Sequence, residues 1–130
     1  MSDLKKYVRL VSKLNRLTKE QKITWKKTTP PESLIGTGES VIEFYVTYYS
    51  DETIGVGSYR YQTYDGYNDR TYWVTGYYFS LLNDNEQELK YRFPDVAGLD
   101  DLLDTIMYET ANIGNVVDSL LDAPDDAEED

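Results

Sequence analysis

"VIEFYVTYYSDETIGVGSYRYQTYDGYNDRTYWVTGYYFSLL", residues 41–82, decides the fold of this chain. Apolar and polar residues alternate through it, and the turn-forming runs at 50–52 and 65–69 divide it into three parts. Alternation over short runs is typical of β-strands, so the stretch predicts a meander of three antiparallel strands joined by tight turns. Gly76 interrupts the third strand and is a candidate β-bulge.

Two further strands are predicted, one on each side of this meander. "KITWK", residues 22–26, alternates with Ile23 and Trp25 on one side, which predicts a first strand at about 22–28. "ELKYRF", residues 88–93, turns its apolar residues to one face and predicts the fifth strand. Before the meander, "TTPPESLIGTGE" contains two prolines and two glycines and is interpreted as a loop that crosses the fold.

Apolar residues recur at helical spacing before and after the predicted sheet. From Ser2 or Asp3 to about Thr18 this spacing predicts a first helix, whose opposite face is basic. "GLDDLLDTIMYETANIG", residues 98–114, predicts a second helix that Gly114 ends, and "NVVDSLLD" adds one or two further turns. The first stripe consists of Leu4, Val8, Val11 and Leu14, widened by Leu10 and Leu17, and the second of Leu99, Leu102, Leu103, Ile106 and Thr110.

The order of these elements predicts an α+β fold. It consists of an N-terminal helix, a five-stranded, mostly antiparallel sheet and a C-terminal helix pair packed on one face of the sheet. One face of the sheet is therefore expected to be core and the other to be exposed. The length of 130 residues fits a single domain, residues 1–122, followed by an acidic disordered tail, residues 123–130.

The chain contains no cysteine and no histidine. Without thiolate or imidazole groups it cannot build a Ser-His-Asp or Cys-His nucleophile system, an ordinary zinc site or a disulfide framework. A carboxylate pair could still hydrolyse glycosides, but no two acidic residues are marked by the sequence as sharing a cleft. The sequence therefore predicts a protein that is not an enzyme and that holds no metal or cofactor, with a carboxylate enzyme as the weakest alternative. It also has no apolar run of membrane-spanning or signal-peptide length, so a cytoplasmic location without membrane contact is expected.

Charge is distributed unevenly along the chain, which has a net charge of −11. Residues 1–27 hold nine Lys or Arg against two acidic residues, whereas residues 95–130 hold twelve carboxylates and no cation. Because contacts to phosphates require cations, this composition disfavours direct nucleic-acid binding. The acidic half is instead suited to a basic partner, such as a nucleic-acid-binding protein.

Tyrosine is concentrated in the meander, where ten of the thirteen tyrosines lie between Tyr45 and Tyr78. Alternation sends Tyr59 and Tyr61 to the face opposite Ile54 and Val56, so both faces of the sheet receive aromatic rings. Rings that the core cannot hold are candidates for a partner-binding surface. Two alternatives remain open: a purely structural role as strand-forming residues, and stacking of nucleotides or sugars. The candidate residues are Tyr59, Tyr61, Tyr64, Tyr67 and Tyr72.

A second candidate for partner binding is the run "DDLLD", with Asp100, Asp101 and Asp104. Regularly spaced carboxylates can imitate a phosphate backbone and meet basic side chains of another protein. The run resembles the magnesium motif of prenyl-transferring enzymes in its letters, but a second such motif is missing. The helix dipole also favours acidic residues in a first turn, which is the structural interpretation.

The layout of the chain resembles small uncharacterised proteins of bacteria and their prophages. The resemblance is carried by "LVSKLNRLTKEQKITW", residues 10–25, followed by the tyrosine-rich meander and the leucine-rich acidic helix, with "LTKEQKITW" as its local signature. It implies a mobile-element context, in which small acidic proteins bind and block a host or defence protein, as anti-CRISPR and anti-restriction proteins do.

These patterns predict a non-catalytic, small acidic binding protein that engages and inhibits a macromolecular partner. The expected type is a phage or mobile-element anti-defence protein, such as an anti-CRISPR protein or a nucleic-acid mimic. The alternative is an aromatic-lined module that senses or sequesters a nucleotide-like ligand. Exposed aromatic residues are also compatible with a homodimer.

Overall fold

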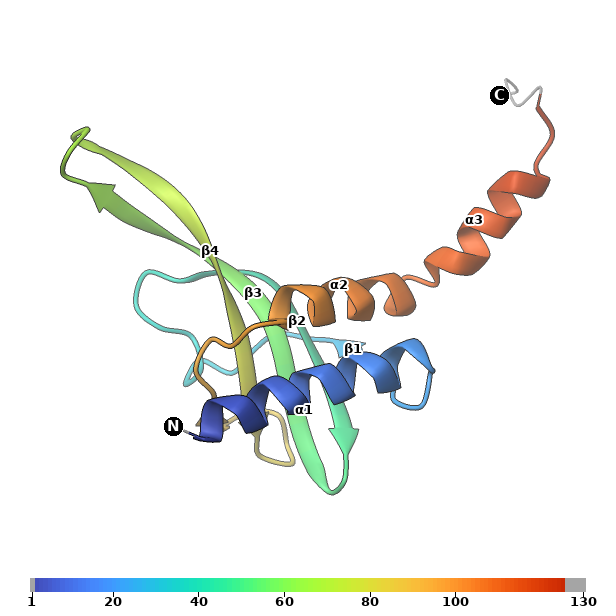
Figure 1. The fold of residues 1–130 in the computed structure, drawn as a ribbon, viewed down its shortest axis with the longest axis horizontal. Helices are drawn as coiled ribbons and strands as arrows, with labels where there is room; N and C mark the ends of the chain where they lie inside the picture. Colours follow the sequence, from blue (N-terminus) through green and yellow to red (C-terminus); the bar gives the residue numbers. More distant parts are fainter. Residues whose placement is uncertain (1, 126–130) are drawn as a thin grey trace.

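A computed structural model describes residues 2–125 of the chain (Figure 1). The predicted α+β class is confirmed: a helix, a five-stranded antiparallel sheet and two C-terminal helices follow one another. Most of the tail predicted at 123–130 lies outside the described residues. The elements are α1 (Ser2–Lys19), β1 (Lys26–Lys27), β2 (Ser40–Tyr49), β3 (Glu52–Asp65), β4 (Arg70–Leu82), β5 (Leu89–Arg92), α2 (Leu99–Thr110) and α3 (Ile113–Asp122).

The sheet is a meander in which the strand order follows the chain order, β1-β2-β3-β4-β5. Ser50 and Asp51 form the two-residue turn between β2 and β3, with φ of 53° and 65°. Positive φ at both positions is the geometry that matches the twist of a tight hairpin. The turn fixes the register of the long β2 and β3 strands, so it also fixes which side chains face the helices.

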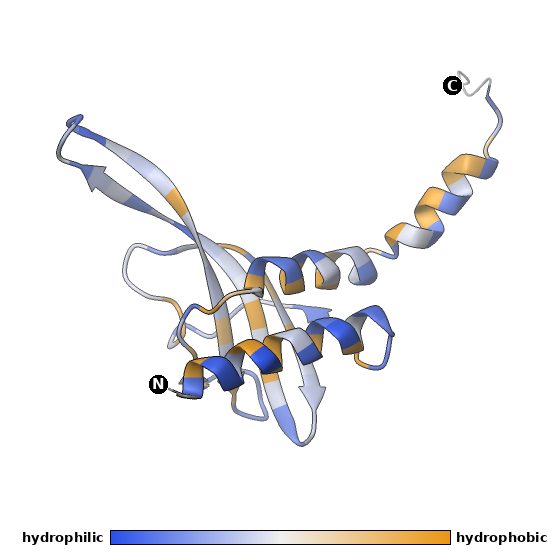
Figure 2. Ribbon diagram, in the orientation of Figure 1, coloured by the Kyte–Doolittle hydropathy of each residue, from blue (hydrophilic) through white to orange (hydrophobic). Residues whose placement is uncertain are grey.

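The helices α1 and α2 lie side by side across one face of the sheet (Figure 1). Hydrophobic positions recur along both helices (Figure 2), and the stripe of α2 is buried as predicted from Leu99 to Ile106. In α1 the prediction is only partly right, because Leu4 and Val8 are exposed. The main core is formed by Val11, Leu14, Leu17, Ile23, Trp25, Tyr45, Ile54, Val56, Phe79, Val96, Leu99, Leu102, Leu103 and Ile106.

The opposite face of the sheet is not left to solvent, which corrects the expectation of a single core face. The loop before β2 folds back over this face and buries Leu34 against Phe44 and Tyr78. Gly55 makes room for this second core, since the ring of Phe44 occupies the space that a side chain there would fill. Half of the sheet therefore has apolar layers on both sides.

Gly76 is not a bulge, because the β3–β4 register runs past it without interruption. The ring of Tyr59, its cross-strand neighbour, covers Gly76 and fills the space of a side chain. The register shifts lie elsewhere, between Val41 and Glu43 in β2 and at the end of β4. The glycine thus serves close packing of a ring on the backbone, which alternation alone does not distinguish from a bulge.

The first strand is much shorter than the predicted 22–28. Ile23 and Trp25 are buried, but they precede the strand and pack beside the end of α1. The indole Nε1 of Trp25 donates a hydrogen bond to Thr18 Oγ1 at 3.0 Å. Alternating burial here reflects a segment folded against a helix end rather than a paired strand.

The C-terminal helix is divided earlier than predicted. Asn112, with φ of 57°, takes the left-handed conformation that ends α2, and Gly114 lies inside α3. Asparagine tolerates this conformation better than most residues. Of the two C-terminal helices, α2 packs on the sheet, whereas α3 has no buried residue and points away from the body (Figure 1).

None of the helices in the described part of the chain is both long enough and apolar enough to cross a membrane.

Candidate partner-binding arm

The β3–β4 hairpin extends well beyond the rest of the sheet (Figure 1). The last β2–β3 pair is Ser40 with Arg60, and β5 pairs with β4 only from Ser80 to Leu82. Residues 61–74, here called the arm, therefore form a two-stranded ribbon with no third strand among the described residues. The arm contains four of the five tyrosines predicted as partner-binding.

Aromatic side chains of the arm are exposed on both of its faces. Tyr61 and Tyr72 alternate onto one face, and Tyr64 and Trp73 onto the other, because directly paired residues share a face. The exposed fractions are 36% for Tyr61, 60% for Tyr64, 99% for Tyr67, 49% for Tyr72 and 51% for Trp73. The arm thus carries the large, rigid rings that recognition surfaces use.

Local contacts hold the tip of the arm in one conformation. Asp65 accepts hydrogen bonds from the side-chain amide of Asn68, at 2.7 Å, and from the backbone N–H of Tyr67, at 3.0 Å. The hydrogen bond from Asn68 is the main reason why the pKa of Asp65 is lowered. The Tyr64 hydroxyl donates to Asp69 at 2.5 Å, which raises the pKa of this phenol. An ordered tip loses less conformational entropy when it binds.

Arg60 and Trp73 form a cation–π pair at the base of the arm, with the guanidinium 4.9 Å from the ring centroid. Trp73 is not among the residues predicted from the sequence, although it lies in the same strand as Tyr72. Its signal was available, since tryptophan is enriched at interfaces and Trp73 lies in the tyrosine-rich meander.

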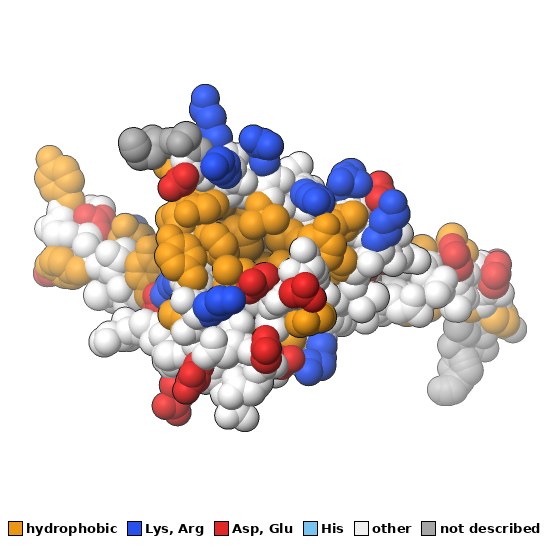
Figure 3. Space-filling model, turned by 90° about the horizontal axis from the view of Figure 1, so that it is seen from below, with side chains coloured by type: hydrophobic (Ala, Val, Ile, Leu, Met, Phe, Trp, Pro, Cys, Tyr) orange, Lys and Arg blue, Asp and Glu red, His pale blue; other side chains and the backbone are white. Residues whose placement is uncertain are grey.

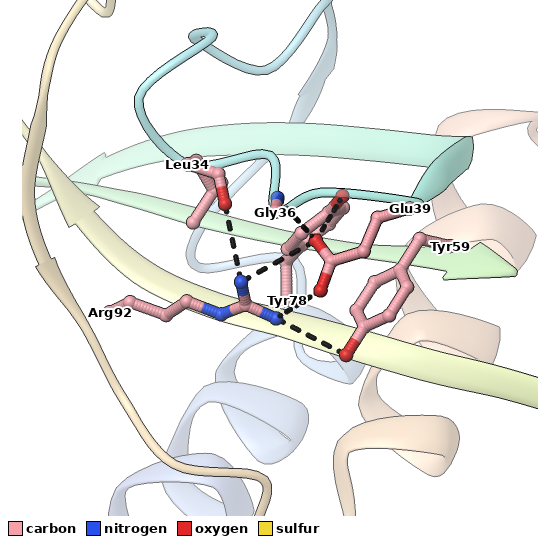
Figure 4. Close-up of polar contacts among 6 residues, drawn as sticks. All are labelled: Leu34, Gly36, Glu39, Tyr59, Tyr78 and Arg92. Atoms are coloured by element: carbon pink, nitrogen blue, oxygen red, sulfur yellow. Dashed lines mark hydrogen bonds and ion pairs between the residues drawn. The ribbon is translucent and has the colours of Figure 1, made fainter. Parts of the chain in front are cut away.

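Tyr59 differs from the other predicted tyrosines because it belongs to a half-buried network (Figure 4). Glu39 accepts hydrogen bonds from the Tyr78 hydroxyl at 3.1 Å and from the Gly36 N–H at 2.7 Å. Arg92 forms an ion pair with Glu39 at 3.3 Å. The guanidinium also donates to the Tyr59 hydroxyl, at 3.2 Å, and to the Leu34 carbonyl, at 3.2 Å. The network ties the loop before β2 to β3, β4 and β5, which gives Tyr59 a structural role.

Sequence reasoning missed this network. Alternation in the fifth strand does place Arg92 opposite the apolar face of Tyr91 and Phe93, which was a usable signal. The alternating pattern gave no indication of Glu39, because a loop residue has no periodicity and its partner, Arg92, is far away in the chain.

The network makes the free energy of unfolding depend on pH in the alkaline range. Burial, followed by the charge of Glu39, raises the pKa of the Tyr78 phenol from 10.0, its ordinary value. Above pH 10 the unfolded chain releases this proton while the folded chain keeps it, so stability falls as pH rises. Urea unfolding at pH 9 and at pH 11 measures this fall in the free energy of unfolding. The fall is expected to be smaller in Tyr78→Phe than in the wild-type chain, by about 1 kcal/mol. Equal losses in the two proteins would contradict the raised pKa.

The acidic candidates lie at the base of the arm, apart from its tip. Asp100, Asp101 and Asp104 are exposed on α2. After burial, the charges of Asp100 and Asp104 are the main causes of the raised pKa of Tyr77, which places these carboxylates beside β4. The structure thus does not gather the tyrosines and the aspartates into one site. Within residues 2–125 no three acidic side chains are grouped so that they could hold a metal ion.

A separate apolar area, which the sequence analysis did not predict, lies beside α1. Figure 3 shows hydrophobic side chains gathered between a row of Lys and Arg and several acidic residues. Its packing includes an edge-to-face pair of Tyr7 and Phe93, with centroids 5.0 Å apart, and Lys13 Nζ 5.7 Å from the Tyr49 ring centroid. Most of these rings are half-buried against the core, so they serve stability first.

Comparison with known proteins gives no relative for this arrangement: no family model, no curated protein and no solved structure matches the chain. The geometry of the arm and its surroundings therefore carries the functional argument.

Proposed function

We propose that the protein is a non-catalytic binding protein that engages a partner protein through the arm and inhibits that partner by occupying its surface. The observation that carries this proposal is the exposure of five aromatic side chains on a projecting, ordered ribbon. Tyrosine and tryptophan dominate the binding energy of protein interfaces, since they bury large areas at little cost in rotamer entropy. The layout resemblance to small acidic proteins of bacteria and prophages supports an anti-defence setting.

The charges near the arm support a protein partner over a nucleic acid. The arm and its first flanking pair contain Asp65 and Asp69 against Arg60 and Arg70, so no cationic groove accompanies the rings. The acidic surface of α2, with Asp100, Asp101 and Asp104, adds a field that steers basic partners toward the base of the arm.

The alternative of a nucleotide-like ligand receives less support. Tyr61 and Tyr72 point to one face of the arm and Tyr64 to the other, so these three rings do not line a common cavity. Tyr59 and Tyr61 border an open hollow of about 250 Å³ beside the loop before β2. A hollow of about 370 Å³ lies elsewhere, between the ends of α1 and α2, and is lined mainly by polar residues beside Ile23 and Trp25.

Single alanine substitutions in the arm are expected to weaken partner binding strongly without loss of stability. Tyr67→Ala and Tyr72→Ala remove exposed rings that make no side-chain hydrogen bond among the described residues. Each is expected to weaken binding about 30-fold, as at an interface hot spot. The partner is first captured from a lysate of the native host, and its affinity for each variant is then measured by biolayer interferometry.

Tyr48→Ala is the matched control, because Tyr48 is 67% exposed but lies on β2, outside the arm. If Tyr48→Ala weakens binding as much as the arm variants, the arm is not the binding surface.

Replacing Asp100, Asp101 and Asp104 by asparagine tests the steering role separately. It is expected to lower the association rate about tenfold at low salt and to leave the dissociation rate unchanged.

A further inference from the structure

The outer edge of β4 is open along the arm. On this side β5 pairs only with Ser80–Leu82, and its ladder ends where the Phe93 N–H donates to the Phe79 carbonyl at 2.7 Å. Residues 70–78 of β4 therefore have β3 on one side and no strand on the other, as far as the chain is described. Thr71, Trp73 and Thr75 are all exposed on this edge.

The direction of the backbone groups along this edge follows from the hydrogen bond at Phe79. In an antiparallel strand the N–H and C=O of one residue point to the same side, and the side alternates from residue to residue. Because the Phe79 carbonyl points toward β5, the N–H and C=O groups of Thr71, Trp73 and Thr75 point out of the open edge. The tight turn at Ser50–Asp51 gives the same result, since it pairs Tyr49 with Glu52 and so directs the odd-numbered residues of β3 toward β4.

This edge lacks the features that normally protect edge strands. Residues 71–78, "TYWVTGYY", contain no charged residue and no proline, and their register has no bulge. Their β-branched and aromatic side chains favour strand pairing. A ribbon of two strands is also only marginally stable in water, so a further strand would stabilise the arm.

We propose that a second copy of this chain pairs with this edge, antiparallel and about a twofold axis at Trp73. Trp73 then pairs with Trp73 of the second copy, and Thr71 with Thr75 of the second copy. Tyr77 also points its N–H and C=O outward, but it is half-buried, and the three exposed residues with outward-pointing groups, Thr71, Trp73 and Thr75, are symmetric about Trp73. Each of their pairs therefore exchanges its N–H···O=C bonds in both directions. The two sheets become one continuous sheet across the dimer.

The length and charges of the edge fit this register. With Trp73 at the centre, the last pair of the ladder is Gly76 with Arg70 of the second copy. The strand of the second copy therefore ends before Ser80, where the pairing with β5 begins. Asp95 lies near this end of the edge, because it follows Phe93, whose N–H is bonded to the Phe79 carbonyl, and its charge contributes to the raised pKa of Tyr77. The cation at position 70 thus approaches a carboxylate across the interface.

Edge pairing leaves both faces of the arm free. The dimer would therefore present two sets of aromatic side chains, and the inference does not rest on the proposed binding of a partner protein. A twofold arrangement of two arms would bind a dimeric target more tightly than one arm, through effective concentration.

The absence of cysteine from the chain allows a direct test by single-cysteine cross-linking. Residues that face each other in a hydrogen-bonded pair have Cα atoms about 5.5 Å apart, which a disulfide can span. Under mild oxidation at micromolar concentration, Trp73→Cys is expected to form a covalent dimer. Tyr67 and Tyr48 are both more exposed than Trp73 but lie away from the twofold axis. Tyr67→Cys and Tyr48→Cys are therefore expected to stay largely uncross-linked. Equal cross-linking at all three positions, or efficient cross-linking of Val74→Cys but not of Trp73→Cys, would overturn the pairing about Trp73.

Thr75→Pro gives an independent test that keeps the indole. The Thr75 N–H points out of the sheet, so proline at this position removes an edge donor and leaves the β3–β4 ladder intact. Sedimentation equilibrium is expected to show a dimer for the wild-type chain, with a dimer dissociation constant at least about tenfold higher in Thr75→Pro. Thr75→Ala keeps the N–H and is expected to dimerise like the wild type. A wild-type chain that stays monomeric at about 1 mM would refute the dimer, while partner capture by the arm would still be decided by the alanine variants.

Discussion

Replacing Gly57 by alanine is expected to lower the free energy of unfolding by about 3 kcal/mol, a large part of the stability of a domain of this size. Gly57 lies in β3 opposite Phe44, beside the register shift in β2. A Cβ atom at this position would collide with the carbonyl oxygen of Glu43 and come within 2.9 Å of the Phe44 Cα. These are backbone atoms of the neighbouring strand, so the collision cannot be relieved by rotating a side chain.

Gly66→Ala is the matched control for this substitution. Gly66 lies in the turn at the tip of the same hairpin, where a Cβ would meet only the Tyr64 ring at an ordinary 3.5 Å. Its expected effect is within about 0.5 kcal/mol. Urea unfolding followed by circular dichroism measures both variants. If Gly57→Ala unfolds at the same urea concentration as Gly66→Ala, then β2 and β3 are not packed as closely as the structure has them.

Replacing Arg92 by methionine is expected to cost about 3 kcal/mol, because it leaves Glu39 without its ion-pair partner in a half-buried site. The side chains of Arg92 and Glu39 are 30% and 15% exposed, so water compensates only in part for the lost ion pair. The substitution also removes the donor to the Leu34 carbonyl and to the Tyr59 hydroxyl. Methionine fills much of the same volume, so the measured loss reports on polar contacts rather than on a cavity.

Lys90 provides the comparison within the same strand. Its ion pair with Glu52 joins side chains that are 51% and 41% exposed, and Lys90→Met is expected to cost less than about 1 kcal/mol. A double variant with Glu39→Gln and Arg92→Met is expected to recover part of the loss, because no unpaired charge remains in the site. Equal effects of Arg92→Met and Lys90→Met in thermal unfolding would show that the network adds nothing to stability.

Local patterns predicted the part of the fold that is built from neighbouring strands. Alternation and turn residues were sufficient for β2, β3 and β4, since each strand pairs with the next through a short connection. They failed for Trp25, whose burial comes from contact with Thr18 rather than from a ladder. They also failed for the face covered by Leu34, because a loop that folds back has no period from which its contacts could be predicted.

For the candidate site, the sequence predicted which tyrosines are exposed better than it predicted which residues they contact. Tyr61, Tyr64, Tyr67 and Tyr72 are exposed, as expected from an excess of rings over the space in one core. Tyr59 lies instead beneath Arg92, a residue more than thirty positions away whose approach depends on the path of the whole meander. The helix α3 shows the same limitation: Val116, Val117, Leu120 and Leu121 are all exposed, since an amphipathic pattern specifies a face but not what covers it.

The order of the strands has a consequence for how quickly the chain folds. The β2–β3 and β3–β4 hairpins close short turns, so this part of the sheet forms at a low entropic cost. The docking of α1 against α2 is different, because Gln21 and Glu109, which are hydrogen-bonded at 3.2 Å, lie 88 residues apart. Contacts between the two helices can form only after the meander has brought the two ends of the chain together. The rate-limiting barrier to folding is therefore expected to involve the docking of the helices rather than the pairing of the strands.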